Sequence, residues 1–155
     1  PLDDPLESET AATITGLGDM ALHHHSDAGV LTVLLPDEVG GLQVSSDHAD
    51  GQGWIDVTPT DGALVMNIGD MMQIWSNGRY RAALHRVRPI TDWPRYSVPF
   101  FFNPAYDTEV APLVATAEAS PAKYRAVNWG DFRQARADGD FADYGHEIQI
   151  ADFRL

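Results

Sequence analysis

The stretch "GVLTVLLPDEVGGLQV" (residues 29–44) decides the fold, because it holds two β-rich runs separated by a turn. Aliphatic and β-branched residues dominate 29–35 and 42–44, and strands favour such residues. The break between them, "PDEVGG" (36–41), supplies the proline, aspartate and glycines that tight turns require. The stretch therefore predicts two short strands joined by a tight connection.

The same pattern continues toward the C-terminus. Further β-rich runs lie at 54–57, 63–69, 81–88 and 95–102. The breaks between runs, "DHADGQG", "PTDG", "SNG" and "PITDWP", carry turn residues, and no helical period separates the runs. Several short strands at this spacing indicate an antiparallel sandwich or barrel rather than alternating strands and helices. We predict a mainly β fold, a double-sheet jelly roll.

The two ends of the chain differ from this central region. The first 20 residues are polar and acidic with little periodicity, so we expect a lead-in segment there. A short helix is predicted to begin at Asn128 and to end near Gly139. The predicted organisation is a truncated lead-in at 1–20, a jelly-roll core at 21–104 and a C-terminal extension at 105–155 that packs on the core.

Composition excludes several classes of partner. The chain has 155 residues and a net charge of −13, with 23 acidic residues against 10 basic ones. Such a balance disfavours nucleic acid, because lysine and arginine supply most of the attraction to phosphate. No apolar run approaches the roughly 18 residues that span a bilayer, and no signal-like segment opens the chain. We expect a soluble, cytoplasmic protein with no membrane partner.

The segment "LHHHSDAG" (22–29) holds the strongest candidate for a metal site. The chain has no cysteine, so a metal must be held by nitrogen and oxygen. Alternate side chains of an extended segment share a face, which places His25 with Asp27 and excludes His24. The same parity leaves His23 as a rival ligand. His25 and Asp27 are the better chelating pair, because a carboxylate lies two residues from an imidazole on the same face.

A third ligand must come from a distant histidine, and the candidates are His48, His85 and His146. His85 lies in the predicted strand at 81–88, and a rigid element holds a ligand precisely. The other two lie in an aspartate-rich loop and in the tail, where we expect them to face solvent. Two histidines and one carboxylate with open positions opposite them are the arrangement of non-haem Fe(II) oxygenases.

The run "RYSVPFFF" (95–102) adds a candidate anion clamp. Arg95 and Ser97 share a face of this predicted strand. A planar guanidinium beside a hydroxyl suits the far carboxylate of a dicarboxylic acid, which arginine binds through two hydrogen bonds. Phe100, Phe101 and Phe102 are predicted to be buried core residues of the sheet, with at most one of them lining a pocket.

Three segments together resemble a known family: "HSDAGVLTVLLPDEVGGLQV", then "W.DV.P..GALVMNIGDMMQIWSNGRYRAALHRV", then "RYSVPFFFNP". They closely resemble the C-terminal catalytic half of 2-oxoglutarate/Fe(II)-dependent dioxygenases of the isopenicillin N synthase-like group. The resemblance covers about residues 16 to 115 and combines HxD, a distant histidine and RxS in that order.

By this resemblance His25, Asp27 and His85 would ligate Fe(II), and Arg95 and Ser97 would hold the distal carboxylate of 2-oxoglutarate. The chain would then use O₂ and 2-oxoglutarate to oxidise a small organic substrate, releasing succinate and CO₂. Asn67 and Tyr96 lie in the matching runs, and we give them no catalytic role.

The sequence departs from the family in three respects, one of which is a longer loop between the ligands at "HADGQG". Ser26 stands where the family often has threonine. Family members also carry a further N-terminal portion, usually with a tyrosine-bearing strand that helps to bind 2-oxoglutarate, so the chain resembles a catalytic-core fragment that is inactive if this portion is required. Two alternatives stay open: a non-catalytic jelly roll that binds a metal or a carboxylate, and an Fe(II)/O₂ oxidase that does not use 2-oxoglutarate. The substrate and the oligomeric state are not indicated.

Overall fold

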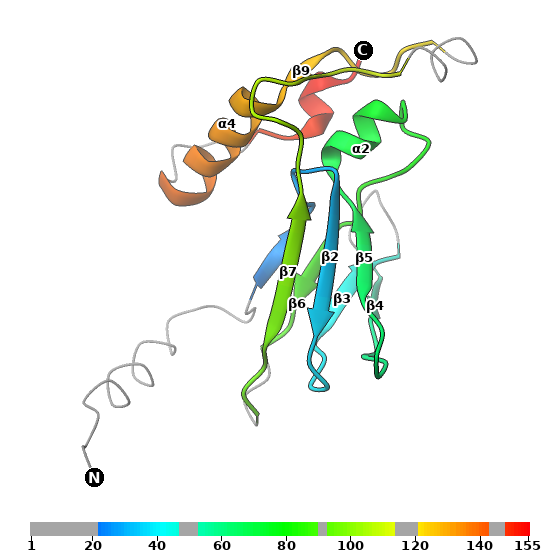
Figure 1. The fold of residues 1–155 in the computed structure, drawn as a ribbon, viewed down its shortest axis with the longest axis vertical. Helices are drawn as coiled ribbons and strands as arrows, with labels where there is room; N and C mark the ends of the chain where they lie inside the picture. The colour runs from blue at the N-terminus through cyan, green and yellow to red at the C-terminus, as the bar shows by residue number, and fades with distance from the viewer. Residues whose placement is uncertain (1–21, 47–52, 90–92, 114–120, 143–147) are drawn as a thin grey trace.

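The computed structural model describes residues 22–46, 53–89, 93–113, 121–142 and 148–155 (Figure 1). The six predicted strands are present, most of them somewhat shorter than the runs that predicted them, and three further strands at 22–25, 109–110 and 127–128 were not predicted. The strands are β1 (Leu22–His25), β2 (Leu31–Pro36), β3 (Leu42–Ser45), β4 (Trp54–Asp56), β5 (Val65–Ile68), β6 (His85–Val87), β7 (Ser97–Phe102), β8 (Glu109–Val110) and β9 (Val127–Asn128).

Two antiparallel sheets form the body of the fold. One has the strand order β1-β6-β3-β4 and the other the order β5-β2-β7, while β8 and β9 pair separately. Figure 1 shows the three-stranded sheet in front of the four-stranded one. Side chains from both sheets line one cavity between them. The prediction of a mainly β jelly roll is confirmed.

A short helix, α2 (Asp70–Trp75), was not predicted, because the sequence shows no helical period in this region. Six residues make fewer than two turns, and so short a helix shows no clear 3.6-residue period. Two of its side chains, Met71 and Ile74, are fully buried. The helix follows β5 directly and fills part of the interval before β6.

The predicted C-terminal helix is confirmed as α4 (Trp129–Ala142), which runs slightly past the expected end. The Asn128 side-chain oxygen accepts a hydrogen bond from the backbone N–H of Asp131 (3.1 Å), as a residue that caps a helix does. A 3₁₀ helix (Ile150–Phe153) follows. Within the described residues no helix is long and apolar enough to cross a membrane.

The best-buried hydrophobic cluster lies beside the sheets rather than between them. Its members come from the residue before β2, from α2 and from the C-terminal extension: Val30, Met71, Ile74, Val110, Tyr124, Val127, Trp129 and Phe132. The extension thus packs on α2 and closes one end of the sandwich (Figure 1). The space between the sheets stays open as a cavity.

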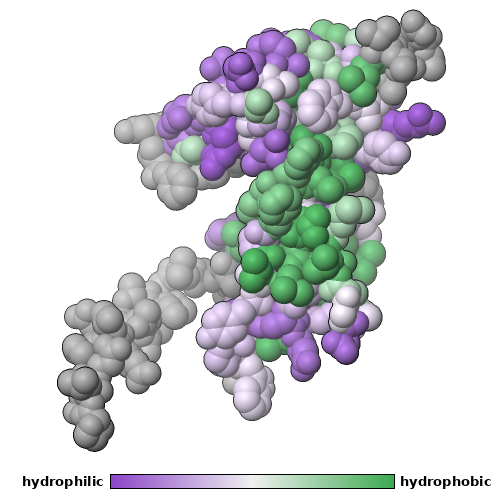
Figure 2. Space-filling view, viewed as in Figure 1, coloured by the Kyte–Doolittle hydropathy of each residue, from purple (hydrophilic) through white to green (hydrophobic). Residues whose placement is uncertain are grey.

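The prediction that three successive phenylalanines are buried is wrong. Phe100, Phe101 and Phe102 are 64%, 52% and 55% exposed. Side chains alternate along β7, so Phe101 lines the cavity, whereas Phe100 and Phe102 lie on the outer face of the sheet. Figure 2 shows apolar side chains gathered on this face. Apolar side chains of the outer face remain largely exposed because no described residue covers them.

The location of the core gives a stability prediction. Replacing fully buried Ile74 with alanine should lower the free energy of unfolding by about 2–5 kcal/mol, through lost burial and a residual cavity. Phe100→Ala, on the exposed face, should cost no more than about 1 kcal/mol. Urea denaturation followed by circular dichroism measures both, and equal losses would contradict this placement of the core.

Candidate metal centre

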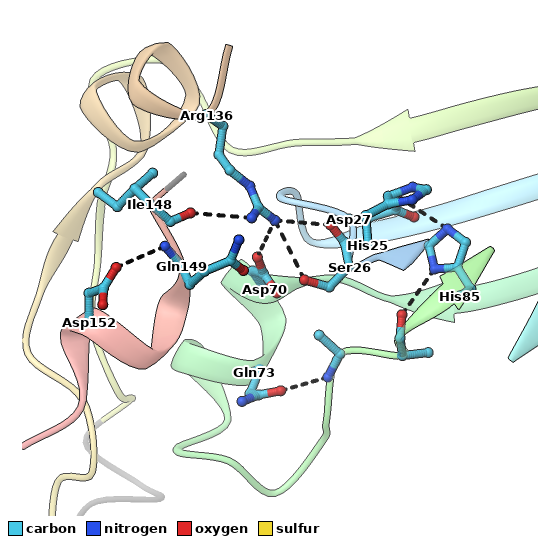
Figure 3. A network of polar contacts seen from close by, with 12 residues as sticks. His25, Ser26, Asp27, Asp70, Gln73, His85, Arg136, Ile148, Gln149 and Asp152 are labelled. Carbon is cyan, nitrogen blue, oxygen red and sulfur yellow. Dashed lines mark hydrogen bonds and ion pairs between the residues drawn. The ribbon is translucent and has the colours of Figure 1, made fainter. Parts of the chain in front are cut away.

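Three predicted ligands meet at one point of the fold. The antiparallel register of β1 and β6 sets His25 directly opposite His85, and Asp27 follows two residues after β1. One ligand atom from each of the three side chains lies within 4.8 Å of the others. His25, Asp27 and His85 are thus the potential metal-binding cluster found among the described residues (Figure 3).

Each imidazole is oriented by the backbone carbonyl of the residue two positions earlier. Nδ1 of His25 lies 2.9 Å from the carbonyl oxygen of His23, and Nδ1 of His85 lies 3.0 Å from that of Ala83. A carbonyl only accepts, so in this pairing both Nδ1 atoms carry the hydrogen. The lone pair of each ring then sits on Nε2, the atom that faces Asp27, and such a backbone bond is how proteins fix the tautomer of a metal-binding histidine.

The two oxygens of the Asp27 carboxylate have different surroundings. Oδ2 accepts hydrogen bonds from the Thr32 hydroxyl and from the Asn67 side-chain amide, the latter at 2.7 Å. Oδ1 lies 3.6 Å from Nε2 of His25 and 3.7 Å from Nε2 of His85. These separations are too long for direct hydrogen bonds and suit donor atoms that share one ion. Two imidazole nitrogens and one carboxylate oxygen form a donor set that fits Fe(II).

The protonation equilibria of the three groups are coupled. Burial of Asp27 alone would raise the pKa of its carboxyl, but the interactions with His25, Thr32 and Asn67 outweigh burial and hold this pKa well below its usual range. The interaction with Asp27 raises the pKa of His25, whereas burial lowers the pKa of His85. A charged carboxylate therefore faces one imidazole that gains a proton readily and one that resists it.

Arg95 and Ser97 line the same cavity as the three ligands. Arg95 lies two residues before β7 begins, and its guanidinium donates to the Ser97 hydroxyl (2.8 Å) and to the Gly40 carbonyl (3.1 Å). The cavity measures about 460 Å³, which lies within the usual range for small-molecule sites. Its other lining residues include Leu34, Val44, Val65, Arg81, Val87, Pro99 and Phe101.

The remaining histidines do not join this cluster in the described structure. His23 and His24 are exposed, and His23 contributes only its backbone carbonyl to the orientation of His25. The parity argument that left His23 open as a rival failed because the β1–β6 register shifts between Leu22 and His25, so side chains do not alternate regularly along β1. His48 and His146 lie outside the described residues.

Two residues that hold Asp27 were not predicted as site residues from the sequence. Thr32 of β2 pairs directly across the sheet with Asn67 of β5. Both side chains point into the cavity, where they meet the carboxylate. A polar residue at an inward position of each of two apolar strands was the available signal. The strand pairing that joins them is not readable from one sequence.

Comparison with known proteins identifies the family. The family model described as the 2OG-Fe(II) oxygenase superfamily matches residues 6–104, more than half of the chain. The chain belongs to this superfamily. Relatives include gibberellin 2-beta-dioxygenase 6 of Oryza sativa subsp. japonica, 39% identical over 83% of this chain and 33% of its own length. Scopoletin 8-hydroxylase of Arabidopsis thaliana is 44% identical over 70% of this chain and 30% of its own length.

Solved structures of the superfamily share the fold. The rice dioxygenase for auxin oxidation matches with a TM-score of 0.75 and 33% identity, over 91% of this chain and 47% of that one. JOX2, solved in complex with 2OG, Fe and JA, matches with a TM-score of 0.69 and 39% identity, over 74% of this chain and 33% of that one. The chain spans about a third of the length of the curated relatives it matches.

The cluster geometry predicts which substitutions abolish metal binding. Alanine at His25, Asp27 or His85 should each remove stoichiometric Fe(II) binding, because two remaining donors hold the ion far more weakly. Alanine at His23 or His24 should leave binding intact, since neither side chain reaches the cluster. Anaerobic titration calorimetry measures this. Loss of iron in His23→Ala together with its retention in His25→Ala would show that the ligand assignment is wrong.

Metal affinity should also depend on pH in a direction set by His25. An imidazole binds metal only when neutral, so protons compete with the ion. Because the pKa of His25 is raised above 6.5, affinity should begin to fall at a pH above 6.5 as the solution is acidified. Calorimetry with Co(II) in a series of buffers tests this. Constant affinity from about pH 8 to about pH 5 would contradict a histidine site.

Proposed function

We propose that the chain is the catalytic region of an Fe(II)- and 2-oxoglutarate-dependent oxygenase, which oxidises a small organic substrate and releases succinate and CO₂. One observation carries this proposal: the cluster of His25, Asp27 and His85 and the pair Arg95 and Ser97 line one cavity. Membership of the superfamily and the JOX2 complex with 2OG and Fe support it.

The three ligands would hold the iron through Nε2 of His25, Nε2 of His85 and Oδ1 of Asp27. When bound, the iron would supply the activation of O₂ that is coupled to oxidative decarboxylation of 2-oxoglutarate. Thr32 and Asn67 keep Oδ2 of Asp27 turned away from the two imidazoles. The carboxylate would therefore present one oxygen, which leaves other positions on the ion for ligands from the cavity.

Arg95 would bind the distal carboxylate of 2-oxoglutarate. Its guanidinium is oriented by Gly40 on one side and by Ser97 on the other, so little conformational freedom remains to be lost on binding. The apolar side chains that line the cavity would exclude water from the co-substrate and strengthen the ionic interaction.

A second cavity offers room for the organic substrate. It measures about 610 Å³ and also includes His25 and Asp27 in its lining. Phe101 and Trp129 supply aromatic surface, and Arg133 supplies a cation. The relatives named for gibberellin and scopoletin support a small organic molecule as substrate.

The charge of the chain bears on its other partners. A net charge of −13 makes nucleic acid an unfavourable partner. O₂ would be the second co-substrate. A cytoplasmic location and the absence of a membrane partner stay predictions.

Removal of Arg95 tests the proposal. Arg95→Ala should weaken 2-oxoglutarate binding by about 2–5 kcal/mol, or roughly 30-fold to several thousand-fold, while Fe(II) stays bound. Arg95→Lys should restore part of the affinity, because an ammonium keeps the charge but loses the paired donors. Ser97→Ala should cost about 0.5–1.5 kcal/mol. The measurement is anaerobic titration of 2-oxoglutarate into the Fe(II) protein, following the metal-to-ligand absorption band.

Arg88→Ala is the matched control, because Arg88 is paired with Asp56 and lies outside this cavity. Unchanged affinity in Arg95→Ala would reject the carboxylate clamp and favour an oxidase that does not use 2-oxoglutarate. Binding of iron and 2-oxoglutarate without any succinate formation would favour the non-catalytic alternative.

A further inference from the structure

A buried arginine lies behind the metal cluster. Arg136 of α4 is only 5% exposed, and its guanidinium reaches three separate segments (Figure 3). It donates to the carbonyl of Ser26 (3.0 Å), to the carboxylate of Asp70 (3.1 Å) and to the carbonyl of Ile148 (3.2 Å). Burying a charge is costly unless it is paired and hydrogen-bonded, and here Asp70, itself fully buried, provides the opposite charge.

The contact with Ser26 places this guanidinium next to the cluster. Ser26 is the one residue between His25 and Asp27. Its carbonyl shares a rigid peptide plane with the backbone nitrogen of Asp27. A hydrogen bond that fixes this carbonyl therefore fixes the orientation of the peptide that joins the two ligands.

Asp70 holds the same turn through its backbone. Its N–H donates to the carbonyl of Asp27 (2.8 Å), and the next N–H, of Met71, donates to the carbonyl of Gly29 (3.0 Å). The start of α2 approaches so closely that a Cβ on Gly69 would lie 2.3 Å from the Gly29 oxygen. The carbonyls of Ser26, Asp27 and Gly29 thus all accept hydrogen bonds from α2 or α4.

We propose that Arg136 is a positioning residue, which acts with Asp70 to hold the His25–Asp27 turn in the shape that lets both side chains bind one ion. Arg136 does not line the cavity that would hold 2-oxoglutarate, although it is among the residues that line the second cavity. The inference rests on that proposed function, because it assumes that the cluster binds a metal. A guanidinium suits this role better than a lysine ammonium, which cannot direct donors to three acceptors in a fixed plane.

The test compares Co(II) affinity and the Co(II) visible spectrum in the parent chain and in Arg136→Gln. Partners that orient metal ligands typically contribute about 10-fold to 100-fold in affinity, and we expect a loss of this size. The band positions and intensities should change as well, because the ligands no longer share one geometry. Arg136→Lys should recover part of the affinity by keeping the charge beside Asp70.

Val127→Ala is the control for a purely structural role. Val127 belongs to the same hydrophobic cluster as α4 and is 2% exposed, but it makes none of the contacts to the turn. It should lower the thermal midpoint while leaving Co(II) affinity within about twofold and the spectrum unchanged. If Arg136→Gln does not fold by circular dichroism, Arg136→Lys carries the comparison.

Parent-like Co(II) affinity and spectrum in Arg136→Gln would overturn the inference while leaving the metal site intact. A loss of affinity in Val127→Ala as large as that in Arg136→Gln would also overturn it, because the effect would then follow stability alone. Failure of the parent chain to bind Co(II) would overturn the proposed function, and this inference with it.

Discussion

The site depends on one constraint: the two oxygens of Asp27 have different partners. One oxygen accepts hydrogen bonds from Thr32 and Asn67, and the other faces the Nε2 atoms of His25 and His85. Two donors from the three-stranded sheet thus orient a carboxylate toward two imidazoles that the other sheet sets opposite each other. A free carboxylate could turn both oxygens toward an ion. This one presents a single oxygen, which leaves room for further ligands.

Keeping the space between the sheets open has a consequence for stability. Most sandwiches gain their stability from side chains interdigitated between two sheets. Here the corresponding volume is the cavity that holds the cluster and Arg95, and the buried hydrophobic cluster lies where α2 meets the C-terminal extension. Arg136 and Asp70 pair in the same region. Helix α4 therefore both packs in the hydrophobic cluster and, through Arg136, contacts the turn between His25 and Asp27.

The sequence alone predicted strands β2 to β7, the C-terminal helix and the pairing of His25 with Asp27, because these follow from local rules, whereas His85 was added as the third ligand by its strand and by the family resemblance. The β-rich runs, the turn residues between them and the helix cap at Asn128 are each encoded within a few neighbouring positions. Thr32 and Arg136 were not predicted as site residues, because their roles depend on contacts with residues far along the chain. Phe100 was misplaced for a related reason: an apolar strand shows that a face is apolar, but not whether anything covers it. The six-residue helix α2 was too short to show a period.

The most direct test of this account is the position of a metal ion in a crystal of the chain grown with Mn(II) and 2-oxoglutarate without O₂, located by anomalous scattering. The account predicts one strong site bonded to Nε2 of His25, Nε2 of His85 and Oδ1 of Asp27, with Oδ2 still accepting from Thr32 and Asn67. An ion bound by both oxygens of Asp27, or held by His23 or His24 instead, would contradict it.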